Sequence, residues 1–149
     1  MPTIKAFRMD GLGNKFVIVD RRKDIVDITK EKIIHLGNLE SFHREIGFDQ
    51  IIFIEKENNK AFPITIFNSD GGEVSACGNG SRCVAYLLGK DLNTKEVKLK
   101  TNNRLLNAKI VGHLDVELAM GKPIFEWNKI PLSKNCLLYT SDAADDLVC

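Results

Sequence analysis

Short apolar runs, separated by polar or glycine-containing segments, dominate the pattern of this chain. Runs of this length, rich in valine, isoleucine and phenylalanine, are typical of β-strands. Two glycines within 11–14 predict a break between the first two strands, and Asn102-Asn103 and Gly112-His113 predict turns between the last three. The pattern predicts strands over 3–7, 16–19, 51–54, 64–67, 97–101, 105–111 and 114–120.

Helical patterns occupy three segments between these runs. Thr29 is suited to cap a helix that runs to about Leu36 and ends at Gly37-Asn38, and a short helical turn is predicted over 39–45. A further helix over 81–88 consists mostly of small and apolar residues, with Gly89 as its predicted stop. Few polar positions on a helix indicate that other elements enclose it.

The order of these elements lacks the regular alternation of a doubly wound parallel sheet. We therefore predict an α+β fold, in which a curved mixed sheet wraps around the central helix that follows Cys77.

Length and charge restrict the class of protein. With 149 residues the chain predicts one domain, and a net charge of +1 argues against nucleic-acid partners. No apolar run approaches the roughly 20 residues that cross a bilayer, and no signal-peptide pattern is found, so we predict no membrane association and a cytoplasmic location. Four cysteines do not indicate a disulfide scaffold.

The last residues differ in character from the rest of the chain. Residues 135–146 resemble the translation of a sequencing-library adaptor, so we interpret 136–149 as a non-native tail and 1–135 as the domain. A native acidic tail is the alternative. On the first interpretation the natural chain continues beyond residue 135, and Cys77 and Cys83 are its native cysteines.

The glycine-rich segment 68–83 offers the clearest candidate chemistry. Cys77 stands directly before Gly78-Asn79-Gly80 and the central helix. Helix N-termini present unpaired N–H groups and a positive dipole end, which favour a thiolate and can hold a carboxylate. Gly78 and Gly80 would also let a ligand approach the backbone. This arrangement suits proton abstraction beside a carboxylate, although buried packing also explains many cysteines.

Other candidates have a plain structural explanation beside the functional one. Asn14, Gln50 and Asn68 stand at turns or strand ends, where amides are common, yet the same amides suit an amino acid's ammonium and carboxylate. Cys83, on the helix, is expected to be buried packing. The spacing of Cys77 and Cys83 fits no common zinc site, so no metal is predicted.

Taken in order, several motifs resemble the diaminopimelate epimerase family. They are Phe7–Phe16 (FRMDGLGNKF), Arg44–Gln50 (REIGFDQ), Phe67–Glu73 (FNSDGGE), Cys77–Cys83 (CGNGSRC) and Met120–Phe125 (MGKPIF). The resemblance implies two similar halves, each a curved sheet around a helix, with the active site between them. This chain resembles the N-terminal half alone.

The resemblance also implies an isomerase that needs neither pyridoxal phosphate nor metal. Such enzymes convert LL-diaminopimelate to meso-diaminopimelate, for lysine and peptidoglycan synthesis, with two cysteines on opposite faces of one α-carbon. Cys77 matches the first cysteine. Substrate contacts fall on Asn14, Gln50, Asn68, Gly78 and Asn79. The partner implied is a small amino-acid substrate, and a homodimer is left open.

The chain also departs from the family pattern. Lys15 replaces a commonly acidic residue, and a second Cys-Gly motif is absent, so we expect this chain alone to be inactive. A related cofactor-independent amino-acid racemase is one alternative. A non-catalytic module that binds an anion at the Cys77 loop is the other.

Overall fold

A computed structural model of the chain describes residues 4–38, 47–122 and 125–126. One curled sheet of eight strands runs β1-β2-β3-β4-β6-β7-β8 from edge to edge, with β5 paired to β4. Two neighbouring pairs, β2 with β3 and β4 with β6, are parallel, and the others are antiparallel. The bounds are β1 Ala6–Gly11, β2 Asn14–Asp20, β3 Gln50–Ile54, β4 Phe62–Asn68, β5 Glu73–Val74, β6 Glu96–Lys100, β7 Leu105–Gly112 and β8 Asp115–Ala119.

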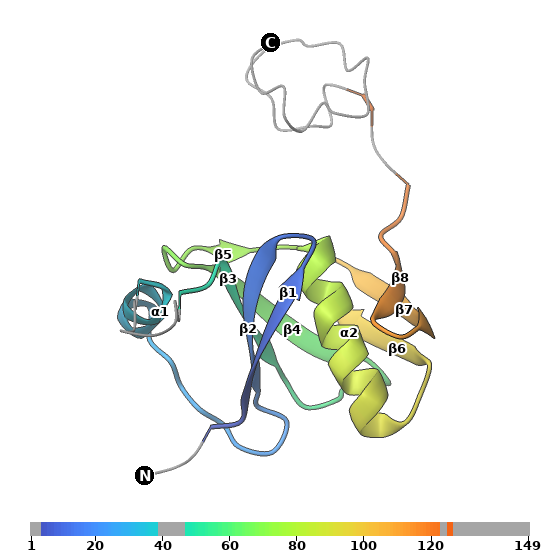
Figure 1. Cartoon of the computed structure of the whole chain (residues 1–149), viewed down its shortest axis with the longest axis horizontal. Helices are drawn as coiled ribbons and strands as arrows, with labels where there is room; N and C mark the ends of the chain where they lie inside the picture. The colour runs from blue at the N-terminus through green and yellow to red at the C-terminus, as the bar shows by residue number, and fades with distance from the viewer. Residues whose placement is uncertain (1–3, 39–46, 123–124, 127–149) are drawn as a thin grey trace.

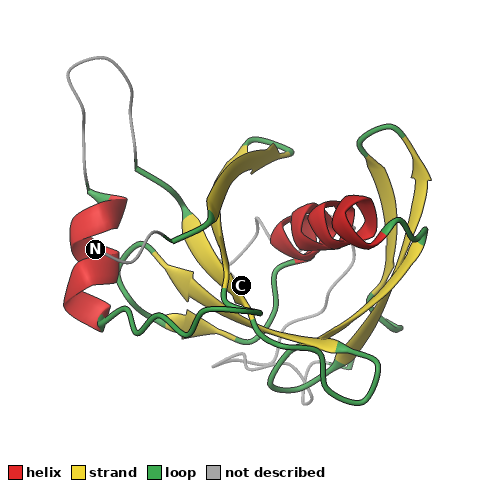
Figure 2. Cartoon of the chain, turned by 90° about the horizontal axis from the view of Figure 1, so that it is seen from below, coloured by secondary structure: helices red, strands yellow, loops and turns green. Residues whose placement is uncertain are grey.

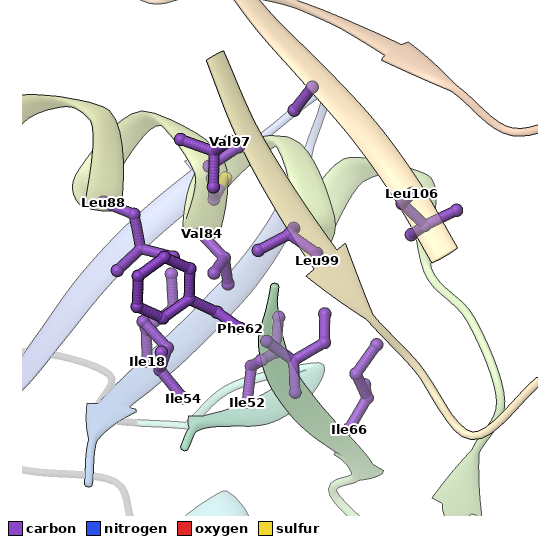
Figure 3. Close-up of a cluster of buried hydrophobic side chains, with 14 of the residues drawn as sticks. Ile18, Ile52, Ile54, Phe62, Ile66, Val84, Leu88, Val97, Leu99 and Leu106 are labelled. Carbon is purple, nitrogen blue, oxygen red and sulfur yellow. The ribbon is translucent and has the colours of Figure 1, made fainter. Parts of the chain in front are cut away.

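The predicted curved mixed sheet around a helix is confirmed. Figure 2 shows the strands curling around α2 (Gly78–Leu92), which fills the hollow of the sheet. Val84 is fully buried and Leu88 nearly so, and both face strand residues such as Ile52 and Leu99 (Figure 3). A helix with so few polar positions needs apolar neighbours on several sides, and the curled sheet provides them.

The first hairpin is tighter than the sequence predicted. β1 runs on to Gly11 and pairs there with Asn14, so only Leu12 and Gly13 form the turn, both with positive φ, at 48° and 88°. A two-residue turn with positive φ matches the twist of the flanking strands. Asn14 is therefore the first residue of a strand. Near the other edge the turn lies at His113-Leu114, one residue later than predicted.

Gly89 does not end the central helix, and that prediction is wrong. The helix continues to Leu92, and Asn93 closes it in the left-handed conformation with φ 52°. Gly89 is instead a point of close contact, because a Cβ there would lie 1.9 Å from Ile110 Cδ1 and 2.9 Å from Thr94 O. The glycine lets α2 approach β7, which the local sequence pattern could not reveal.

The shorter helix lies on the convex side of the sheet. As predicted, α1 (Lys30–Gly37) begins after the cap Thr29, whose side chain accepts from the Lys32 N–H. Its buried Ile33 joins a second apolar cluster with Val19, Ile51 and Phe53, and Figures 1 and 2 show α1 set apart from α2 on the outer face. The turn predicted over 39–45 lies outside the described residues, as does the tail 136–149.

A small ion network ties the far end of α2 to the sheet. The Arg22 guanidinium donates to both Asp20 carboxylate oxygens, at 2.9 and 2.8 Å, and to Asp91 Oδ2 at 2.7 Å. Hydrogen bonds from Arg22 lower the pKa of both carboxyl groups. Among the described helices, none has the length and apolar character that crossing a membrane requires.

Candidate active site

The predicted site residues gather at one end of the curled sheet. Figure 1 shows the N-terminus of α2, the β1–β2 turn and β5 at the same end. Because β2 and β3 are parallel and β4 runs antiparallel to β3, the starts of β2 and β3 and the end of β4 meet there. Asn14, Gln50 and Asn68 occupy those three strand ends.

Cys77 is the N-cap residue of α2. Its backbone is extended, with φ −147° and ψ 111°, and its Sγ accepts the Gly80 N–H at 3.5 Å. The side chain is partly exposed, so a ligand can reach the sulfur. N–H groups at the first helical positions, Gly78 and Asn79, have no intrahelical acceptor. A half-exposed thiol and free backbone donors therefore share this helix end.

The two glycines that follow Cys77 serve different purposes. A Cβ on Gly80 would lie 2.6 Å from Ile52 Cδ1 and 3.1 Å from Phe16 Cε1, so this glycine lets the helix start settle onto the core. The sequence had suggested that Gly80 lets a ligand approach the backbone, but this glycine is buried against the core. Gly78 is partly exposed, and a Cβ there would lie 3.0 Å from Met120 Sδ, which covers the helix start from the end of β8.

Asn79 and Asn14 are brought together although 65 positions separate them. Asn79 Nδ2 donates to Asn14 Oδ1 at 3.0 Å. The guanidinium of Arg82, one turn along α2, donates to Asn79 Oδ1. Arg82 was not among the predicted site residues, although its i, i+3 spacing from Asn79 places the two side chains on one helix face.

Gln50 and Asn68 form a second amide pair on neighbouring strands. They are register partners of β3 and β4, and Gln50 Nε2 donates to Asn68 Oδ1 at 2.9 Å. Gln50 Oε1 is buried and has no hydrogen-bond partner among the described residues. All the predicted contact residues are therefore hydrogen-bonded in pairs or belong to the helix start.

Asp49 joins the strand ends that hold these amides, and the sequence analysis did not single it out. Its Oδ2 accepts the Lys15 N–H at 2.8 Å, its N–H donates to Lys15 O at 2.9 Å, and its carbonyl accepts the Ser69 N–H at 3.1 Å. Asp49 thereby fixes the relative positions of the residues next to Asn14 and Asn68. In the sequence, the position of Asp49 directly before Gln50 could have indicated that it belongs to the candidate site.

The second cysteine has the packing role that the sequence predicted. Cys83 is 7% exposed and belongs to the main core cluster. Burial raises the pKa of its thiol, which keeps it protonated and unreactive at neutral pH. Within the described part of the chain, no three potential metal-ligating side chains lie together.

This end of the domain is equipped for the chemistry of a carboxylate. Backbone donors at a helix N-terminus bind anions, amide side chains can orient polar substituents, and a thiol at the same point can exchange a proton. The thiol of Cys77 lies within the first turn of α2, beside these donors. The geometry is suited to acid–base chemistry at a carbon next to a carboxylate.

Curated proteins with similar sequences are diaminopimelate epimerases. The protein of Pelagibacter ubique (strain HTCC1062) is 45% identical over 145 residues, which covers 97% of this chain and 51% of that protein. The protein of Acidiphilium cryptum (strain JF-5) is 39% identical over 127 residues, 85% of this chain and 45% of its own length. The chain thus spans about half the length of the curated relatives it matches.

Solved structures share the fold at low sequence identity. A phenazine biosynthesis PhzF-family protein from Enterococcus faecalis matches with a TM-score of 0.54 and 10% identity, over 71% of this chain and 40% of its own. A predicted epimerase from Pseudomonas aeruginosa matches with a TM-score of 0.54 and 17% identity, over 74% and 40%. These likenesses concern the architecture alone.

The family model supplies the identification. The model described as diaminopimelate epimerase matches residues 6–126, which include every residue of the two amide pairs and the Cys77 helix start. On this match, and with the α+β fold already described, the chain belongs to the diaminopimelate epimerase family.

Proposed function

We propose that this chain is the half of a cofactor-independent epimerase in which Cys77 exchanges the α-proton of diaminopimelate. In the complete enzyme, Cys77 acts on one face of the α-carbon and a second cysteine acts on the other, converting LL- to meso-diaminopimelate. Asn14, Gln50, Asn68, Gly78 and Asn79 would contact the substrate. A cytoplasmic location and a homodimer of the complete protein stay predictions.

The position of Cys77 is the observation that supports this proposal most directly. An α-proton of an amino acid is a very weak acid, so its removal requires donors that stabilise the developing negative charge. The N–H groups of Gly78 and Asn79 lie at the same helix end as the sulfur. A carboxylate held there would place its α-carbon near Cys77 Sγ, and proximity of this kind lowers the barrier to proton transfer.

Inversion at carbon requires an acid and a base on opposite faces. Cys77 can serve one face only, and Cys83 is buried in the core. We propose that the second group comes from a second half, since the curated relatives are about twice the length that this chain covers. Closure of such a half over the ligand would also exclude water, which strengthens the electrostatic interactions in the site.

The test uses α-proton exchange in deuterium oxide. Diaminopimelate is incubated with the protein extended by its second half, with the same protein carrying Cys77→Ala, and with the 149-residue chain. We expect deuterium incorporation with inversion in the first sample and a loss of about a hundredfold to ten-thousandfold in the second, the range typical of a general acid–base group. We expect no exchange in the third.

A companion measurement on the 149-residue chain separates catalysis from mere anion binding. Iodoacetamide labelling, followed by peptide mass spectrometry, should modify Cys77 much faster than Cys83, and diaminopimelate should protect Cys77. Equal rates at the two thiols, or robust exchange by the half chain, would contradict the proposed function. Protection without any exchange in the extended protein would favour the anion-binding module.

A further inference from the structure

Arg82 lies next to the site, and the proposed function gives it no role. It stands on α2 three residues after Asn79, is partly buried, and its guanidinium donates to Asn79 Oδ1. We propose that Arg82 is a positioning residue, which fixes the direction in which the side-chain amides of Asn79 and Asn14 present their hydrogen-bond donors. This inference rests on the proposed function, because it assumes that the two asparagines meet the substrate.

The guanidinium group of Arg82 determines which atom of the Asn79 amide faces it. Arginine has only donors, so the oxygen of the Asn79 amide must face Arg82. The amide nitrogen of Asn79 then lies on the other side, where it donates to Asn14 Oδ1 at 3.0 Å. Asn14 must therefore turn its own oxygen toward Asn79. Its Nδ2 is left as the free end of this relay, with no acceptor among the described residues.

Without a charged partner, such a relay has no fixed direction. Rotating a side-chain amide by half a turn exchanges its oxygen and nitrogen, and two neighbouring amides can pair in either direction. A hydrogen bond from a charged donor is roughly twice as strong as a neutral one, so Arg82 selects one direction. Because Arg82 is partly buried, solvent ions screen this interaction less than they would a surface pair.

The selected direction has a consequence for the ligand. The free Nδ2 of Asn14 joins the backbone N–H groups of Gly78 and Asn79, so that this side of the site offers donors. Donors of this kind match carboxylate oxygens and repel an ammonium group. Arg82 would thus help to decide which end of an amino-acid group lies over the start of α2, although it does not touch the substrate.

The chain itself contains a matched control for this idea. Gln50 and Asn68 form a comparable amide pair, which is hydrogen-bonded side chain to side chain in the described part of the chain, whereas Asn79 also accepts from a guanidinium. Removal of Arg82 should leave that pair unchanged. Lys90, exposed near the other end of α2, provides a second control, since Lys90→Met removes a positive charge from the same helix.

The first test is the NMR signal of the side-chain amides in the ¹⁵N-labelled 149-residue chain. In Arg82→Met we expect the steady-state ¹⁵N NOE of the Asn14 side-chain amide to fall to about half its original value, with a shift at Asn79. Arg82→Lys, which keeps a charged donor, should restore most of both signals. A change at Asn14, whose hydrogen-bond partner is Asn79 and not Arg82, is the signature of a relay.

In the same spectra, the Gln50 and Asn68 signals serve as the internal reference. They should stay in place in Arg82→Met, and all four amides should stay in place in Lys90→Met. An unchanged Asn14 amide in Arg82→Met would overturn the inference. So would equal changes in both amide pairs, because these would show a general loss of structure in place of a directed relay.

The second test measures kinetics in the protein extended by its second half. We expect Arg82→Met to raise the KM for diaminopimelate about tenfold while kcat changes less than about threefold, with most of the KM restored in Arg82→Lys. An unchanged KM in Arg82→Met would overturn the positioning role. If the unsubstituted protein shows no exchange at all, the proposed function fails, and the NMR result still decides whether Arg82 directs the two amides.

Discussion

The sulfur of Cys77 has a structural role as a helix cap and a proposed chemical role, and Cys77→Ser should affect the two in opposite directions. As the N-cap of α2, the side chain accepts the Gly80 N–H, but the Sγ–N distance is 3.5 Å and sulfur is a weak acceptor. A serine hydroxyl is a stronger acceptor and serine is among the preferred N-cap residues. Serine should therefore cap the helix better while removing the thiol that we propose exchanges the proton.

The expected stabilisation can be worked out from the cap. Replacing a good N-cap residue by alanine costs about 0.5–2 kcal/mol. Because the long Cys77 contact provides only part of that cap, serine should raise the free energy of unfolding by about 0.5–1 kcal/mol. For a chain of this size the change corresponds to a Tm increase of roughly 1–4 °C. Cys77→Ala, which removes the cap, should lower the free energy of unfolding.

Cys83→Ser is the matched control, because it makes the same chemical change at the other described cysteine. Cys83 is 7% exposed and packs in the main core, so a hydroxyl there would be buried among apolar side chains. A buried polar group without a partner costs about 1–3 kcal/mol. This variant should be less stable than the unsubstituted chain and should keep its proton-exchange chemistry.

Urea denaturation of the 149-residue chain measures the free energy of unfolding, and deuterium exchange by the extended protein measures the chemistry. The reasoning predicts that Cys77→Ser is more stable and inactive, and that Cys83→Ser is less stable and active. A less stable Cys77→Ser variant would refute the capping argument. A Cys77→Ser variant that exchanges deuterium at the original rate would refute the catalytic argument.

Two further predictions concern the far end of α2. Hydrogen bonds from Arg22 lower the pKa of Asp20 and Asp91, so the stability they provide is present above the ordinary carboxyl pKa and is lost as pH falls through the lowered values. Arg22→Met should flatten the fall of Tm between about pH 5 and pH 2, and an equally steep fall would contradict this. Gly89→Ala should lower the free energy of unfolding, measured by urea denaturation, by about 1–2 kcal/mol, because the new Cβ would overlap Ile110. This loss is expected despite a gain of about 1 kcal/mol in helix propensity. A more stable variant would show that Ile110 moves aside.

Local sequence patterns predicted most of the helices and strands. The features that they did not predict depend on contacts between residues that are distant in the sequence. The apolar runs located most of the strands, and the candidate site was predicted from Cys77 before a glycine-rich helix start. The local sequence around Gly89 predicts a helix stop. The glycine is needed instead because Ile110, which is distant in sequence, packs against it in the folded chain. Asn14 and Asn79 were each predicted as contact residues, but their hydrogen bond could not be predicted, because it depends on the β1–β2 hairpin lying against α2.

Three of the four side-chain amide oxygens in the candidate site already accept a hydrogen bond. Asn14 Oδ1, Asn79 Oδ1 and Asn68 Oδ1 each accept a hydrogen bond from a neighbouring side chain, and Gln50 Oε1 is buried. The amide nitrogens of Asn79 and Gln50 donate within the two pairs, whereas those of Asn14 and Asn68 have no acceptor among the described residues and can donate to a ligand. A zwitterionic amino acid needs donors for its carboxylate and acceptors for its ammonium. On the proposed function, we infer that these amide nitrogens and the backbone N–H groups at the start of α2 recognise a carboxylate of the substrate.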